Sequence, residues 1–197
     1  MEFTTSYSPV TMAFASMTKK ELSDFYKWFM LNLPYCLDEL IQAVWKTSGF
    51  ESWSADFSPE SLGMLGEWFA ARVERRDLTP GEIDEIKSKM TSVIEVTTWG
   101  LTCESESLAV CVGMYYGQVA IKNNPLLSWE QLKGSKKLAD YGQPVISGLG
   151  VVPINPVRVA NALAFGIVRG SKTGSRLRES YDYWSKLVMP KGSPNKS

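Results

Sequence analysis

The chain has 197 residues, 44% of them hydrophobic and 12% aromatic, and its formal net charge at pH 7 is zero. This length suits a single domain, and the apolar content excludes disorder for the body of the chain. Because histidine is absent, histidine-based acid–base catalysis, Ser–His and Cys–His nucleophiles and the commonest zinc ligand are excluded.

The N-terminal region predicts a short arm followed by two helices. Residues 1–16 are rich in Ser and Thr, and we expect them to form a flexible arm. Thr18 is followed three residues later by a glutamate. This is the spacing of a capping box, so a helix should cover residues 18–33. Pro34 should break that helix and open a second one over residues 34–49.

The pattern of the first helix returns forty residues later. A polar loop, 50–57, separates the two copies, and a further helix should begin at Ser58. We interpret residues 17–92 as a lobe built from a duplicated helix pair, whose two copies bury their tryptophans against each other. The recurring positions are Thr18, Leu22, Phe25, Trp28, Phe29 and Leu33, matched by Ser58, Leu62, Leu65, Trp68, Phe69 and Val73.

The middle of the chain predicts one more capped helix and then a strongly apolar one. A second capping box starts a helix over residues 79–90. The β-branched and aromatic residues of 93–101 favour an extended segment. An apolar helix should then cover residues 105–123. Gly113 and Gly117 lie four residues apart on it and should let another element approach closely.

The C-terminal part predicts a β-hairpin and two helices. Two short runs with strand character, between Leu127 and Leu149, should form the hairpin. Helices should cover residues 155–170 and 175–188. The polar tail, 190–197, should be disordered.

These elements define the expected architecture. With about seven helices and one short hairpin, the fold class should be mostly α with a minor α+β character. We expect a single helical domain over residues 17–189. Its second lobe, residues 93–189, should have a helix–hairpin–helix arrangement.

The zero net charge hides an asymmetry along the chain. Residues 151–197 carry eight basic and two acidic residues, a balance of +6, so residues 1–150 carry a balance of −6. Most of the acidic excess lies between Glu51 and Glu106. The acidic middle and the basic end could neutralise each other inside the monomer, or the acidic residues could face a basic partner.

The loop 50–57 and the helix after it hold the candidate partner-binding residues. A tryptophan exposed among acidic residues is a typical hot spot for a basic protein. Trp53 is the aromatic residue that we expect to be exposed, although a packed loop anchor is the alternative. The candidate set is Glu51, Trp53, Asp56, Glu60 and Glu67.

Two alternatives involve other activities. A histidine-free enzyme would use carboxylates or lysines, and it predicts a closed pocket in which Glu104 or Asp56 has a raised pKa. A regulatory protein would bind nucleic acid through the basic last helix, but Glu179 and Asp182 interrupt its positive charge, which makes this the weaker alternative. Residues 166–173 nearly match a phosphate-binding loop. Serine replaces its second glycine and a helix is predicted before it, so we expect a helix end there.

Cysteine usage and hydropathy indicate a cytoplasmic protein. The three cysteines have no metal-type spacing, which suits reduced thiols. No apolar run approaches the roughly 18 residues that a membrane span needs, and the first ten residues lack the features of a secretory signal. We expect no membrane association, no cofactor and no metal.

Six segments of the chain carry a resemblance to a known type of protein: 22–33, 58–74, 107–124, 129–130, 141–146 and 155–158. The resemblance is to uncharacterised bacterial cytosolic proteins with a helix–hairpin–helix arrangement, several of which look like immunity proteins that neutralise polymorphic toxins. It implies a helical fold and a binding protein whose partner is a basic toxin or effector, and it assigns no catalytic residues.

Overall fold

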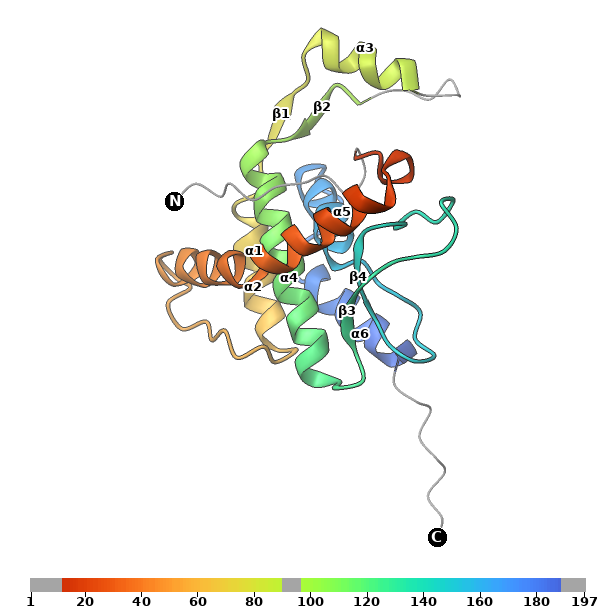
Figure 1. Ribbon diagram of the computed structural model, residues 1–197. Helices are drawn as coiled ribbons and strands as arrows, with labels where there is room; N and C mark the ends of the chain where they lie inside the picture. Colours follow the sequence, from red (N-terminus) through yellow and green to blue (C-terminus); the bar gives the residue numbers. More distant parts are fainter. Residues whose placement is uncertain (1–11, 90–96, 189–197) are drawn as a thin grey trace.

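We describe the fold from a computed structural model, which covers residues 12–89 and 97–188. Within these ranges the chain forms six α-helices and two small antiparallel sheets (Figure 1), which confirms the predicted class, mostly α with a minor β component. The elements are the 3-10 turn η1 (Phe14–Ser16), the helices α1 (Lys19–Trp45), α2 (Ser61–Ala70), α3 (Pro80–Lys89), α4 (Cys103–Asn123), α5 (Pro156–Val168) and α6 (Arg176–Val188), and the strands β1 (Arg75–Asp77), β2 (Trp99–Leu101), β3 (Ser128–Gln131) and β4 (Pro144–Ser147).

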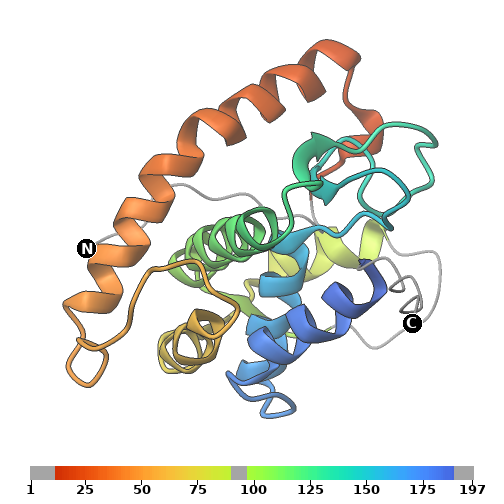
Figure 2. The same cartoon turned by 90° about the horizontal axis from the view of Figure 1, so that it is seen from below.

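Helix α4 lies at the centre of the molecule because it has no polar face over most of its length. Every residue from Ser107 to Gly117 is buried, and a helix that is apolar on all sides must be covered on all sides. Helices α1, α2, α5 and α6 all pack against it (Figures 1 and 2). Buried side chains from Phe14 to Trp184 form one hydrophobic cluster. None of the described helices is long and apolar enough to cross a membrane.

Two glycines let other elements reach the backbone of α4, as their spacing predicts. A Cβ at Gly113 would lie 2.6 Å from the Cα of Val157, at the start of α5. A Cβ at Gly117 would overlap with the ring of Trp129, on β3. Only glycine therefore permits both contacts without displacing the neighbouring element.

The prediction that Pro34 separates two helices is wrong. Helix α1 runs from Lys19 to Trp45 with Pro34 inside it, so one helix forms where two were expected. Proline has no amide hydrogen, and the carbonyl of Met30, four residues earlier, loses its helical partner. Pro34 is exposed and Met30 is 37% exposed, so water can reach this carbonyl. Buried side chains on both sides of the proline hold α1 on the core.

Replacing Pro34 by alanine should stabilise the protein. A proline inside a helix costs about 3 kcal/mol, and its restriction of the unfolded chain offsets about 0.4–1 kcal/mol of that cost. We therefore expect the free energy of unfolding, measured by urea denaturation, to rise by about 2 kcal/mol. Pro80→Ala is the matched control, because a proline in the first helical position costs nothing. Equal stability of Pro34→Ala and the unaltered chain would contradict this account of α1.

The two copies of the repeated pattern occupy different environments. Trp68 is buried, and its Nε1 donates a hydrogen bond to Thr47 Oγ1 at 2.8 Å. Trp28 is half-buried on α1, more than about 20 Å along the helix from Thr47. The expectation that the two tryptophans bury each other is therefore wrong. Helix α1 packs on α4, whereas α2 packs mainly on α6 and α4.

Strands β1 and β2 pair antiparallel and, with α3, project from the body of the molecule (Figure 1). The predicted capping box of α3 is present, with Glu82 accepting a hydrogen bond from the Thr79 amide at 2.8 Å. Arg76 of β1 lies 2.6 Å from the same carboxylate. The contacts with Arg76 and Thr79 lower the pKa of Glu82 to about 2. Strand β2 confirms the end of the extended segment predicted at 93–101, whose first residues lie outside the described ranges.

The predicted hairpin between Leu127 and Leu149 is confirmed, because β3 and β4 pair antiparallel there. Helix α5 follows, and the side chain of Asn155 caps it by accepting a hydrogen bond from a first-turn amide at 3.0 Å. Most of the predicted arm, 1–16, and all of the predicted tail, 190–197, lie outside the described residues.

Candidate partner-binding site

The connection between α1 and α2 and the outer side of α2 hold the four predicted acidic residues. Glu51, Asp56, Glu60 and Glu67 are all exposed. Glu60 and Glu67 are seven residues apart, which is about two helical turns, so they lie on one face. Met64 lies between them on that face and is 38% exposed.

The prediction that Trp53 is exposed is wrong. Its side chain is only 3% exposed, and its Nε1 donates a hydrogen bond to the backbone oxygen of Ser61 at 2.9 Å. Its ring centroid lies 5.4 Å from that of Tyr115, on α4. The alternative, a packed loop anchor, is the observed state. The acidic neighbours Glu51 and Asp56 did not reveal it, because they point to solvent while the ring between them turns inward.

The exposed tryptophan of this region is Trp45, at the end of α1. Its side chain is 46% exposed, and its Nε1 donates a hydrogen bond to the Trp53 backbone oxygen at 2.9 Å. A ring that is fixed at one edge and open to solvent is a typical interface anchor. No sequence signal indicated this exposure, because Trp45 stands four residues after Ile41 and beside Val44 in an apolar helical segment. We call the set Trp45, Glu51, Asp56, Glu60, Met64 and Glu67 the acidic surface.

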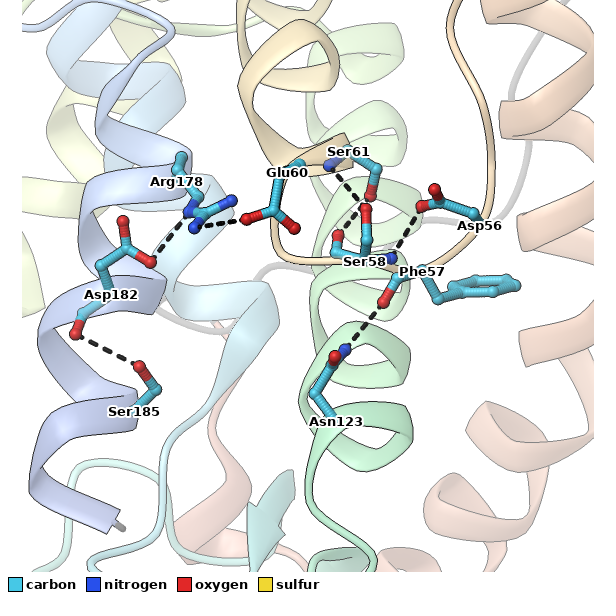
Figure 3. Close-up of polar contacts among 9 residues, drawn as sticks. All are labelled: Asp56, Phe57, Ser58, Glu60, Ser61, Asn123, Arg178, Asp182 and Ser185. Atoms are coloured by element: carbon cyan, nitrogen blue, oxygen red, sulfur yellow. Dashed lines mark hydrogen bonds and ion pairs between the residues drawn. The ribbon is translucent and has the colours of Figure 1, made fainter.

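Hydrogen bonds within the connection hold Asp56 and its neighbours in place (Figure 3). Asp56 Oδ1 accepts a hydrogen bond from the Ser58 amide at 2.8 Å, and contacts with the Ser58 hydroxyl and amide lower the pKa of Asp56. Within the described ranges, Phe57 is the only non-glycine residue with a positive φ, +56°. Its ring stacks on Tyr115 at 4.8 Å, and its carbonyl accepts a hydrogen bond from Asn123 at 2.8 Å. Such backbone strain is often found at functional sites.

Glu60 connects the acidic surface to the basic C-terminal helix. Arg178 of α6 lies 3.1 Å from Glu60 and 2.8 Å from Asp182 (Figure 3). The backbone amide of Glu60 and the Arg178 guanidinium lower the pKa of Glu60. The acidic middle and the basic end of the chain therefore neutralise each other at this point, as one of the two alternatives predicted. The Glu60 side chain is 76% exposed, so solvent screens the pair.

The remaining two carboxylates, Glu51 and Glu67, lie outside the ion-pair network of the described residues. Glu51 accepts a hydrogen bond from the Gly49 amide at 2.8 Å. Neither Glu51 nor Glu67 has an ion-pair partner among the residues that the structure describes. Their negative charge is therefore available to a second molecule.

Asp56 and Glu104, the two carboxylates that the enzyme alternative placed in a closed pocket, are both exposed. The pKa of Asp56 is lowered, not raised. Glu104 is exposed and lines a depression of about 150 Å³, smaller than the roughly 300–1,000 Å³ of ligand pockets. Glu106 is half-buried, and burial raises its pKa against the opposing effect of Arg76. Among the described residues, no group of three or more Cys, Asp and Glu could hold a metal ion.

In the basic C-terminal region, Arg176 and Arg178 form ion pairs with carboxylates, and the glycine-rich segment 166–173 forms the end of a helix. Arg176 lies 2.5 Å from Glu179, and Arg178 lies 2.8 Å from Asp182. The near match to a phosphate-binding loop lies at the end of α5, where Gly170 has a φ of +74°. This is the conformation of a helix-ending glycine, so the predicted helix end is confirmed.

The sequence matches no family model, and no curated protein or solved structure compared with it is similar. The resemblance to immunity proteins gains no support from these comparisons and stays a prediction. A functional assignment must therefore start from the geometry of the acidic surface.

Proposed function

We propose that the protein is a non-enzymatic, cytoplasmic binding protein that recognises a basic protein, such as a bacterial toxin or effector, and inhibits it by occlusion. The acidic surface is the observation that carries the proposal. It combines four exposed carboxylates with two partly exposed apolar side chains, Trp45 and Met64, along the end of α1, the connection and α2. None of the three cysteines, all within the described ranges, forms a disulfide, which supports a cytoplasmic location.

The residue types of the acidic surface suit protein recognition. Tryptophan and methionine are enriched in interfaces, and a few aromatic anchors supply most of the binding energy. Carboxylates around such an anchor speed association with a positively charged protein and orient it. Glu51 and Glu67 supply this charge, and Glu60 can exchange Arg178 for a cation of the partner.

The scaffold holds the acidic surface in one shape before a partner arrives. Thr47, just beyond α1, accepts hydrogen bonds from Trp68 and Arg72 of the α2 region, both at 2.8 Å. Tyr115 of α4 donates a hydrogen bond to the Ser61 hydroxyl at 2.9 Å. These contacts join α1, the connection, α2 and α4. Few groups would then be ordered on binding, which lowers the entropic cost.

Reversing the two unpaired charges tests the proposal. A variant with Glu51→Lys and Glu67→Lys should associate with the partner at least about tenfold more slowly at low salt, because electrostatic steering depends on these charges. Its association rate should also depend less on salt. The partner is first captured from the native cell with the unaltered protein and identified by mass spectrometry. Association rates are then measured by surface plasmon resonance at several salt concentrations.

Glu130→Lys is the matched control, because Glu130 is an exposed glutamate outside the acidic surface. It lies on β3, which contacts the N-terminal half of α1 through Tyr26. Its association rate should stay within about twofold of the unaltered protein. Circular dichroism checks that each variant is folded. An unchanged rate for the double variant, or capture of acidic proteins or nucleic acid only, would contradict the proposal.

A further inference from the structure

An open cavity lies at the N-terminal end of α1, away from the acidic surface at its C-terminal end. It has a volume of about 510 Å³ and is open to solvent. One wall is the first turn of α1, and the other is the loop between β3 and β4, which lie side by side in Figure 2. The volume is within the range of roughly 300–1,000 Å³ found for small-molecule sites.

Five polar side chains line this cavity, and one of them, Gln131, donates its amide hydrogens to the cavity walls. The other four can donate hydrogen bonds to a ligand: the ammonium groups of Lys19 and Lys133 and the hydroxyls of Ser23 and Tyr141. None of the four has a hydrogen-bond or ion-pair partner for its side chain among the described residues. The neighbouring Lys20, by contrast, pairs with Asp24 at 2.7 Å. No acidic residue lines the cavity, so its positive charge is not neutralised from within.

The walls of the cavity are held together by the protein's own contacts. Gln131 of β3 donates hydrogen bonds from Nε2 to the Leu22 carbonyl at 2.5 Å and to the Gly142 carbonyl at 3.1 Å. Gly142 has a φ of +78°, and a Cβ there would lie 2.5 Å from the Leu22 side chain. The loop therefore closes tightly on α1, and the cavity exists before any ligand binds.

We propose that this cavity binds a small organic phosphate. Two ammonium groups act as point charges toward a phosphate, and the two hydroxyls add donors to its remaining oxygens. An arginine would bind a carboxylate better, because its planar guanidinium donates two parallel hydrogen bonds to it. No arginine lines the cavity. Leu22 and Leu132 provide an apolar wall for the organic part of the ligand.

Binding of adenosine monophosphate, with adenosine and inorganic phosphate as comparison probes, tests the site in the full chain. Calorimetry should show saturable binding of the nucleotide in the millimolar range or tighter, and at least about tenfold weaker binding of adenosine. Lys133→Ala should weaken nucleotide binding by about tenfold. Lys136→Ala is the matched control, because Lys136 is an exposed lysine of the same loop that does not line the cavity. It should leave the affinity unchanged.

Two results would overturn the site. One is the absence of saturable binding of both the nucleotide and inorganic phosphate at millimolar concentrations. The other is an equal loss of affinity in Lys133→Ala and Lys136→Ala, which would indicate non-specific attraction to the loop. Both lysines are exposed, so neither substitution should prevent folding. The double variant of Glu51 and Glu67 should bind the nucleotide normally, so failure of either proposal is distinguishable from failure of the other.

Discussion

Replacing Trp53 by alanine should lower the free energy of unfolding by about 3–5 kcal/mol. The ring is almost fully buried, its Nε1 is bonded to Ser61, and it packs on Tyr115. Alanine would leave a cavity between the connection and α4 and would remove the hydrogen bond from the ring to the Ser61 carbonyl. Urea denaturation followed by circular dichroism measures the change.

Trp45→Ala is the matched control for this prediction. Trp45 is 46% exposed and makes the same kind of hydrogen bond, so its loss should cost only about 1–2 kcal/mol. Binding should respond in the opposite order. Trp45→Ala should weaken partner binding at least about tenfold, whereas a Trp53→Ala protein that is still folded should bind nearly normally. Equal stability losses in the two variants would contradict the assignment of Trp53 to the core and Trp45 to the surface.

Replacing Gly113 by alanine should lower the free energy of unfolding by about 3 kcal/mol or more. The new methyl would lie 2.6 Å from the Val157 Cα, 2.8 Å from the Val157 amide nitrogen and 2.9 Å from the Pro156 oxygen. These are backbone atoms, so no side-chain rotation relieves the contact. Helix α5 would have to move away from α4, and this is the most extensive helix–helix interface in the described structure.

Gly63→Ala is the control for Gly113→Ala, because both change glycine to alanine inside a helix. Nothing lies within 4 Å of a Cβ at Gly63. That variant should be more stable than the unaltered protein by about 0.5–1 kcal/mol, since alanine favours the helix. The two variants are expected to shift the denaturation midpoint in opposite directions. A Gly113→Ala variant as stable as the unaltered protein would show that α5 is not held against α4 as described.

Exposure of the acidic residues could be predicted at the candidate site, but the position of its aromatic anchor could not. A carboxylate stays in water unless a partner compensates its burial, so exposure follows from the residue type alone. A tryptophan gains from burial wherever apolar surface is available. Whether Trp45 or Trp53 is buried therefore depends on how the connection folds over Tyr115. The ion pair between Glu60 and Arg178 likewise requires α2 and α6 to be neighbours.

The residue pattern alone is enough to predict the mostly helical class, the helix starts at Thr18 and Thr79, and an apolar helix over residues 105–123. These depend on hydrogen bonds within one turn, or on a residue pattern with no polar face, and need no knowledge of the rest of the chain. Contacts between distant parts of the chain were needed to show that α1 continues through Pro34 and that β1 pairs with β2. Burial along α1 outweighs the local cost of the proline, and strand pairing joins segments that are distant in the chain. Both effects depend on contacts that no local pattern contains.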